Sequence, residues 1–165
     1  MDAFDEDILQ RADEYTRLRG LQLEQRLGFG KDGTVWATDR ATAVKVFGRR
    51  DTYDREHAAY RRLADQGVSD VLGHHVPQLL RFDDARLVIE MTIVQAPFLL
   101  DFAGAWLDQQ PAFGEEVLEQ WLEEKQEQFG ERWSHIAAVL AALQGYGIHL
   151  MDIHPGNITF AEANA

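Results

Sequence analysis

The sequence predicts an α+β fold with two lobes, in which a five-stranded antiparallel sheet with one crossing helix precedes a reduced helical lobe. Two observations support this prediction. Short β-rich runs, divided by glycines and polar turns, fill most of residues 21–91. After Pro97 the apolar residues recur at helical spacing instead. We therefore expect a first lobe over residues 1–92 and a second lobe over residues 93–165.

The elements of the first lobe follow from local patterns. Residues 3–19 predict a short amphipathic helix, because apolar residues recur at helical spacing and acids occupy the first turn. Three β-rich runs, separated by a glycine loop and a polar turn, predict an antiparallel meander over residues 21–48. Helix-forming residues predict a helix over residues 53–67. Two further strands are expected around residues 78–82 and 86–91.

Three helices are expected in the second lobe, over residues 99–110, 114–130 and 131–147. Each of the last two carries an apolar stripe along one face. The stripe of the first of these is Val117, Leu118, Trp121 and Leu122, and that of the second is Trp133, Ile136, Ala137, Leu140 and Leu143. Because a complete lobe would bury such stripes against further helices, we expect a second copy of the chain or a partner protein to cover them.

The composition excludes several classes of function. With 165 residues, 45% of them hydrophobic, the chain can bury a real core. Its 16 basic and 28 acidic residues give a net charge of −12, which argues against binding nucleic acid or an anionic membrane surface. Cysteine is absent from the sequence, which excludes thiolate catalysis and Cys-based zinc sites. No signal-peptide or membrane-spanning pattern is found, so we expect a cytoplasmic protein.

The acids concentrate in one part of the second lobe. Residues 101–132 carry nine acids against two bases. This pattern indicates a solvated helical surface, and an acidic docking face is the alternative.

A glycine-rich motif lies between two of the β-rich runs. Gly28, Gly30 and Gly33 form G-x-G-x-x-G, and a β-rich run follows them where a dinucleotide-binding fingerprint would require a helix. In such a hairpin the missing side chains let backbone amides approach phosphates, and Val35 would pack over a base. Lys45, on the next strand, faces the concave side if its valine neighbours face the other way. The alternative is a glycine-rich hairpin beside a solvated lysine.

Glu56, on the predicted helix that follows, is the expected partner of Lys45. A lysine flanked by apolar strand residues needs an anion nearby, because burial penalises its charge. A glutamate on the next helix can hold the ammonium group toward phosphate oxygens. The alternative is that Glu56 pairs with an arginine of its own helix.

The stretch "GYGIHLMDIHPGNITF" carries Asp152 and, five residues later, Asn157. An aspartate here can accept a hydrogen bond from an attacking hydroxyl group and take its proton. An asparagine can offer its amide oxygen to Mg²⁺, a hard cation that prefers oxygen ligands. Pro155 and Gly156 supply the bend between them. The alternative is an ordinary turn after a helix.

Taken in this order, the motifs resemble those of the protein-kinase-like superfamily, over residues 21–160. The resemblance implies that the chain uses ATP and Mg²⁺. It implies a nucleotide site formed by the glycine motif, Val35 and Lys45. The run "LVIEM" is similar to the strand that enters the hinge between the lobes, which implies adenine hydrogen bonds from the backbone near Glu90 and Thr92.

The resemblance also implies catalytic roles. Lys45 and Glu56 would position the phosphates, Asp152 would act as the base, and Asn157 would bind the metal. The usual H-R-D sequence is degenerate, with Leu150 and Met151 preceding the aspartate. The run "DIHPGN" is closer to the loops of atypical and small-molecule kinases, such as those of ubiquinone biosynthesis, than to the usual eukaryotic form.

One departure from the family concerns the principal metal ligand. The family carries this ligand as the aspartate of a D-F-G motif that follows the catalytic loop, and no aspartate follows Asn157. Glu162 is the single acid in that tail, and we expect it to substitute as a metal ligand if its strand directs it to the cleft. The A-P-E segment and the activation loop are absent too, so no peptide-docking platform is expected.

Three functions remain open at this point. The first is an ATP-dependent phosphotransferase acting on an unknown hydroxyl acceptor, either a small molecule or a protein. The second is a nucleotide-binding pseudokinase that acts as a regulatory interaction module. The third is that the chain is a fragment of a longer kinase. Asp152 favours the first, because a pure binder needs no base, whereas the missing metal-binding aspartate favours the second.

The histidines and tryptophans carry weaker expectations. His74 and His75 are adjacent on an extended segment and point apart, so we do not expect a metal site there. His154 is expected to brace the loop backbone by hydrogen bonding. Three tryptophans are expected in the core or in an interface: Trp106, Trp121 and Trp133.

Overall fold

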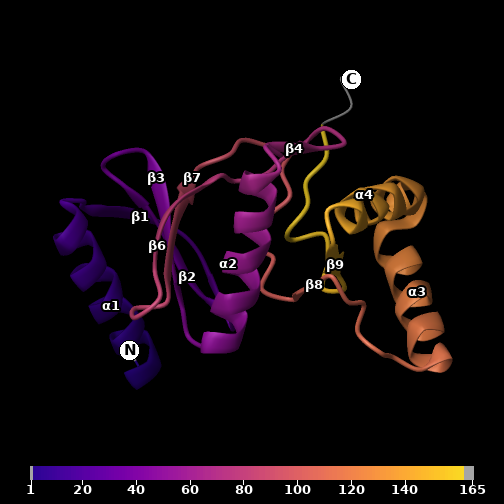
Figure 1. Cartoon of the computed structure of the whole chain (residues 1–165), viewed down its shortest axis with the longest axis horizontal. Helices are drawn as coiled ribbons and strands as arrows, with labels where there is room; N and C mark the ends of the chain where they lie inside the picture. The colour runs from indigo at the N-terminus through magenta and orange to yellow at the C-terminus, as the bar shows by residue number, and fades with distance from the viewer. Residues whose placement is uncertain (1, 162–165) are drawn as a thin grey trace.

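The computed structural model describes residues 2–161 and has a mixed α+β architecture (Figure 1). Its largest sheet has five strands in the order β1-β2-β3-β7-β6, and all neighbouring strands are antiparallel. These strands are β1 (Leu23–Gly30), β2 (Gly33–Thr38), β3 (Thr42–Phe47), β6 (Leu79–Asp83) and β7 (Val88–Thr92). The five-stranded antiparallel sheet predicted from the sequence is confirmed.

Helix α1 (Ala3–Arg19) covers one face of this sheet, on the side opposite α2 (Arg50–Asp65) (Figure 1). Asp2 caps the helix by accepting hydrogen bonds from the N–H groups of Phe4 and Asp5, both at 2.9 Å. Gly20 ends it in the left-handed conformation, with φ of 67°. The buried residues of this layer are Ile8, Ala12, Tyr15 and Leu21, packed on Val44, Val46 and Val88.

Helix α2 (Arg50–Asp65) packs on the opposite face of the sheet. Successive side chains of a strand point to opposite faces. Because Val44 and Val46 pack under α1, their neighbours Lys45 and Phe47 face α2. This alternation is the one expected from the sequence, and it directs a lysine into the layer between the sheet and α2.

The helix predicted over residues 99–110 is wrong. Residues Ala105–Leu107 form the short strand β8, which pairs antiparallel with β9 (Ile148–Leu150). Asp101 and Asp108 bracket this strand with φ of 70° and 61°, a left-handed conformation that interrupts a helix. A short apolar run does not distinguish a helix from a buried strand, and the partner of this strand lies far along the chain.

The other two predicted helices are confirmed as α3 (Glu115–Phe129) and α4 (Trp133–Gly145), joined by a 3₁₀ turn, η1 (Gly130–Arg132). The stripe of α4 is mostly as predicted, with Ile136, Leu140 and Leu143 buried. The stripe of α3 needs correction, since Val117 and Leu122 are 52% and 39% exposed. The buried residues of α3 are Lys125 and Phe129, which lie one and two turns beyond Trp121.

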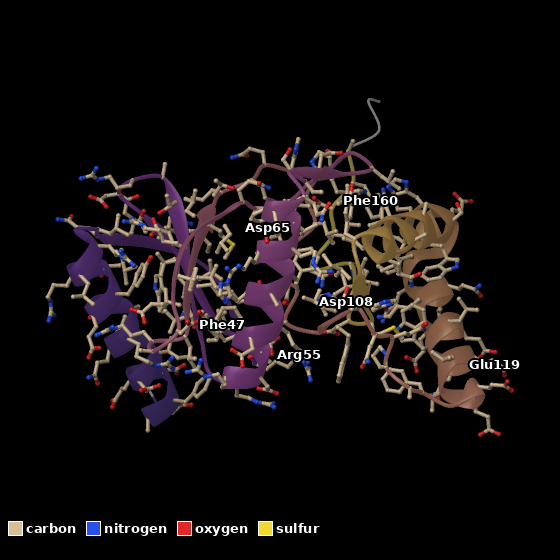
Figure 2. All side chains as sticks on the ribbon, in the orientation of Figure 1. Phe47, Arg55, Asp65, Asp108, Glu119 and Phe160 are labelled. Atoms are coloured by element: carbon tan, nitrogen blue, oxygen red, sulfur yellow. The ribbon has the colours of Figure 1, made fainter. Side chains whose placement is uncertain are left out.

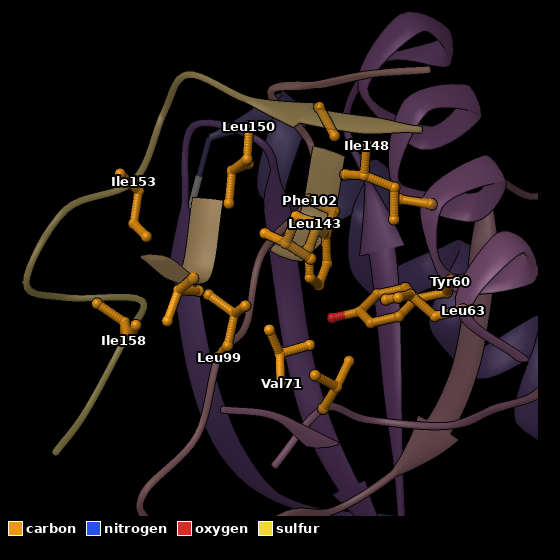
Figure 3. Close-up of a cluster of buried hydrophobic side chains, with 14 of the residues drawn as sticks. Tyr60, Leu63, Val71, Leu99, Phe102, Leu143, Ile148, Leu150, Ile153 and Ile158 are labelled. Atoms are coloured by element: carbon orange, nitrogen blue, oxygen red, sulfur yellow. The ribbon is translucent and has the colours of Figure 1, made fainter. Parts of the chain in front are cut away.

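The α2 face of the sheet belongs to one large hydrophobic core that continues into α4 (Figure 3). Figure 3 shows Tyr60 and Leu63 from α2 in the same cluster as Leu143 of α4 and Ile148 of β9. Leu99 and Phe102 lie between these groups and are fully buried. The segment around residues 99–102 therefore connects the sheet layer to the helices of the second half of the chain.

Two smaller features complete the description. A short hairpin, β4 (Asp70–Val71) with β5 (His74–His75), lies between α2 and β6 and was not expected from the sequence. Among residues 2–161, no helix is both long enough and apolar enough to cross a membrane.

Candidate functional site

Lys45 and Glu56 form a buried ion pair between the sheet and α2. The Lys45 ammonium nitrogen lies 2.7 Å from Glu56 Oε2, and the two residues are only 7% and 1% exposed. β3 directs the lysine into this layer, and α2 brings the glutamate over it. Phe47 lies beside them, with the lysine nitrogen 4.8 Å from its ring centre, and Figure 2 shows Phe47 in this layer. The predicted pairing of the two residues is present in the structure.

The electrostatics of this pair include a third group. Asp101 Oδ1 lies 3.8 Å from the Lys45 nitrogen. Burial opposes the charge of Lys45, but the carboxylates of Glu56 and Asp101 outweigh it, so the pKa of Lys45 is raised. Burial raises the pKa of Glu56 to about 7, against the attraction of Lys45. The lysine therefore stays protonated.

Asp101 was missed from the sequence, and two antiparallel ladders bring it to the site. The Leu100 N–H donates to the Asn157 carbonyl at 2.8 Å, and the Thr159 N–H donates to the Phe98 carbonyl at 2.9 Å. Beyond Asp101, β8 pairs with β9. The loop 101–104 and the loop 151–156 are thus enclosed between the same two ladders and lie face to face.

Gly104 lies directly against Asp152 of the other loop. A Cβ atom placed on Gly104 would lie 2.7 Å from the Cβ of Asp152, closer than two carbons pack. The absence of a side chain at this position lets Asp152 reach the pocket. This pocket has a volume of about 210 Å³. Its lining residues are Lys31, Asp32, Arg49, Asp51, Thr52, Arg55, Ala103, Gly104 and Asp152.

The loop that carries Asp152 is held by its own side chains. The Asn157 amide nitrogen donates to the Asp152 carbonyl at 3.1 Å, and its amide oxygen accepts from the His154 N–H at 3.0 Å. His154 Nδ1 accepts from the Gly156 N–H at 3.0 Å, so the predicted bracing role of His154 is confirmed. Asn157 is 4% exposed. Its oxygen keeps one lone pair beyond the bond to His154.

The glycine hairpin covers the pocket from the sheet side. A Cβ atom on Gly33 would overlap the Val46 carbonyl oxygen, so this glycine is required by the close pairing of β2 and β3. Gly28 and Gly30 have open space around them. Asp32, at the tip, belongs to the pocket lining, and burial together with the nearby Asp101 carboxylate raises its pKa. This acid was not expected from the sequence.

Val35 lies next to Lys45 in the register of β2 and β3 and is partly buried. It packs against the large core on the α2 side of the sheet, the side on which a base would have to lie.

Glu90 and Thr92 lie inside the sheet. The Glu90 carboxylate points to the α1 face, where it accepts hydrogen bonds from Tyr15 at 2.8 Å, Thr42 at 3.0 Å and Arg81 at 2.8 Å. Burial opposes the charge of this carboxylate, but these donors outweigh burial and lower its pKa. The Thr92 N–H donates to the Gln78 carbonyl at 3.0 Å, so it has a protein partner already. Backbone outside the sheet begins after Thr92.

The described residues contain no group of three or more His, Asp or Glu side chains arranged to hold a metal ion. Glu162, which we expected as a metal ligand, lies outside the residues that the structure describes. His74 Nε2 lies 2.8 Å from His135 Nε2 of α4, so this histidine joins two elements of the fold. Asp101 follows Leu100, whose N–H donates to the Asn157 carbonyl.

The sequence does contain a signal for Asp101. Residues 101–104 read D-F-A-G, and Phe102 is fully buried with its ring edge-on to Tyr60 of α2, at a centroid distance of 5.2 Å. From the sequence, such an acid was expected only after Asn157. In this fold Asp101 is flanked by Leu99, which is bridged to Ile158, and by β8, which pairs with β9. Both flanking segments come before α3 and α4 in the chain.

No protein-family model matches the chain, and no curated protein matches it. Eight chains of solved structures do match. One is the structure of the streptomycin–ATP–APH(2″)-IIa ternary complex, which has 16% sequence identity to this chain and a TM-score of 0.42. The match covers 86% of this chain and 39% of that one, so the chain spans about two fifths of the length of that protein.

Proposed function

We propose that the chain binds ATP in the pocket under the glycine hairpin and transfers its γ-phosphoryl group to a hydroxyl acceptor. One observation carries the proposal: a buried lysine, held by Glu56, lies 3.8 Å from Asp101. Both groups are close enough to Asp32, which lines the pocket together with the exposed Asp152, to influence its pKa. A lysine that is buried and still charged is suited to bind phosphate oxygens. The resemblance of the motifs to kinases supports the same function.

In this proposal the sheet and the helical part belong to the two lobes expected from the sequence, over residues 1–92 and 93–165, with the nucleotide between them. Gly28 and Gly30 have open space around them, in which phosphates would lie, and Lys45 would neutralise phosphate charge. Since the Thr92 N–H is engaged by Gln78, adenine would bond to the backbone that follows β7.

The donors present fit Mg²⁺, which prefers oxygen ligands and shares its coordination with nucleotide phosphates. Asp101 offers a carboxylate, and Asn157 offers the remaining lone pair of its amide oxygen. In this proposal Asp101 is the carboxylate ligand of Mg²⁺, the role that we expected for Glu162 from the sequence. A bound Mg²⁺ would neutralise phosphate charge as it develops.

Asp152 is the residue that would meet the acceptor. Its carboxylate would accept a hydrogen bond from the acceptor hydroxyl, orient it in line with the γ-phosphorus and take its proton. The oxygen–phosphorus bond to the acceptor then forms as the bond to the β-phosphate breaks, and ADP leaves. Such catalysis rests mainly on positioning and charge neutralisation, which a small site can provide.

The proposal is tested by calorimetric titration with ATP, with and without Mg²⁺, followed by an assay of phosphate release with water as the acceptor. We expect binding that Mg²⁺ strengthens, and slow turnover that Asp152→Ala abolishes while ATP still binds. If the wild type binds ATP and shows no turnover, the chain is a nucleotide-binding pseudokinase. If it does not bind ATP, the proposal is wrong.

A further inference from the structure

Two side chains of α3, one helical turn apart, hold the loop that carries Asp152. The indole nitrogen of Trp121 donates to the Met151 carbonyl at 2.9 Å. The ammonium group of Lys125 donates to the Ile153 carbonyl at 2.6 Å. Residues four apart lie on the same face of a helix. One face of α3 therefore holds the backbone immediately before and immediately after Asp152.

The carbonyl of Asp152 itself accepts one hydrogen bond, from the side-chain amide nitrogen of Asn157 at 3.1 Å. Three consecutive carbonyl groups thus each accept a hydrogen bond from a side chain. When the peptide planes on both sides of a residue are fixed, its φ and ψ angles are fixed too. The Asp152 side chain is left with only its own rotations, and it is directed at the pocket beside Gly104.

Lys125 is an unusual residue in α3. The charged residues of this helix are all acids apart from Lys125. Figure 2 shows Glu119 pointing away from the molecule, whereas Lys125 is only 8% exposed. Burial lowers the pKa of Lys125, which means that the position disfavours the charge. An apolar side chain would fill this position without that cost. What the charged group adds is its hydrogen bonds, to the Ile153 carbonyl and, at 3.1 Å, to the Gln128 side chain.

We propose that Trp121 and Lys125 are positioning residues, which set where the carboxylate of Asp152 lies in the pocket. The proposal rests on the proposed function in one respect, namely that Asp152 meets the acceptor. It assigns no role to α3 in nucleotide binding, because Lys45 and the glycine hairpin belong to other elements. Loss of either brace should therefore lower kcat and leave the KM for ATP unchanged.

The test uses two variants of the full chain, each with a matched control. Lys125→Met keeps the stem and removes the donor, and Gln128→Ala removes only the other acceptor of Lys125. Trp121→Phe keeps an aromatic ring and removes the donor. Its control is Trp133→Phe, because this indole donates no hydrogen bond within residues 2–161 and its ring contacts Trp121 edge-on.

The primary measurement is amide hydrogen exchange of residues 151–157 without nucleotide. We expect amide exchange to be about tenfold faster in Lys125→Met and Trp121→Phe than in the wild type, and unchanged in the controls. A tenfold change corresponds to the loss of a hydrogen bond that contributes about 1.4 kcal/mol. Thermal unfolding of all four variants should stay cooperative. Exchange that is the same in variants and controls would overturn the proposal.

The second measurement is turnover of ATP with water as the acceptor, together with titration of each variant with ATP. We expect kcat to fall about tenfold in the two test variants, with KM and affinity for ATP unchanged. Faster loop exchange with an unchanged kcat would also overturn the proposal. If the wild type shows no turnover, the proposed function fails separately, and loop exchange alone decides whether α3 positions Asp152.

Discussion

Substituting Gly104 by alanine should displace Asp152 from the pocket. The added Cβ would lie 2.7 Å from the Cβ of Asp152. Carbon atoms pack at about 3.5–4.0 Å, so the two loops must separate by roughly 1 Å. A misplacement of about 1 Å at a catalytic group can cost on the order of 10²-fold in rate. Gly104 does not have a positive φ, so alanine strains nothing but this contact.

The assay is phosphate release from ATP, with ATP affinity and thermal unfolding measured beside it. We expect Gly104→Ala to lose roughly 10²-fold in kcat while ATP affinity and cooperative unfolding are retained, because the displaced group faces the acceptor. Gly145→Ala is the control, since a Cβ at the end of α4 would meet nothing within 4 Å. Wild-type turnover in Gly104→Ala would refute the reasoning, as would a loss of ATP affinity equal to the loss of kcat.

Further outcomes are expected elsewhere in the molecule. Lys45→Ala should weaken ATP binding by about 1–3 kcal/mol, measured by calorimetry, because a charge-assisted contact is lost; equal affinities would exclude this placement of the phosphates. Asp101→Asn should reduce the strengthening of ATP binding by Mg²⁺, measured as the difference between titrations with and without the metal, and an unchanged difference would argue against Asp101 as a ligand. Tyr15→Phe removes a buried hydrogen bond between α1 and β7 and should cost about 1–3 kcal/mol of unfolding free energy in urea, whereas a neutral result would mean that water replaces the hydroxyl. Burial, together with the nearby His135, lowers the pKa of His74 in the folded state. Below the usual histidine pKa of about 6.5 the unfolded chain therefore takes up a proton that the folded chain does not. The free energy of unfolding should fall as the pH drops from about 7 toward about 5. His74→Gln should flatten this slope without removing it, because burial also lowers the pKa of His57, and an unchanged slope would assign the effect to other groups.

The sheet could be predicted because its signals are local. Each hairpin of the meander is encoded by a glycine or polar turn between short apolar runs, and the alternation along β3 fixes the direction of Lys45. The pairing with Glu56 follows from the same alternation, since a buried lysine needs an anion from the element that covers it.

The other half of the site could not be predicted in this way. β8 is too short to show an alternating hydrophobic pattern, and α3 and α4 separate it in the sequence from its partner β9. The residues that lie beside Asp101 in the fold could therefore not be predicted from the sequence. Lys125 was missed for a different reason. A helical pattern predicts that a lysine faces solvent, and Lys125 is buried instead because its ammonium group donates to a loop carbonyl.

The pairing of β8 with β9 also affects how the chain folds. The contacts among β1, β2, β3 and α2 are close in sequence, whereas the two ladders around Asp152 join segments that α3 and α4 separate. Distant pairings lose loop-closure entropy before they gain contacts, so they form late. On a ribosome, which releases the N-terminal part first, the ion pair of Lys45 with Glu56 would exist before Asp152 is synthesised. During that interval the apolar surface of α2 lacks Leu143 and Ile148 and stays in contact with solvent.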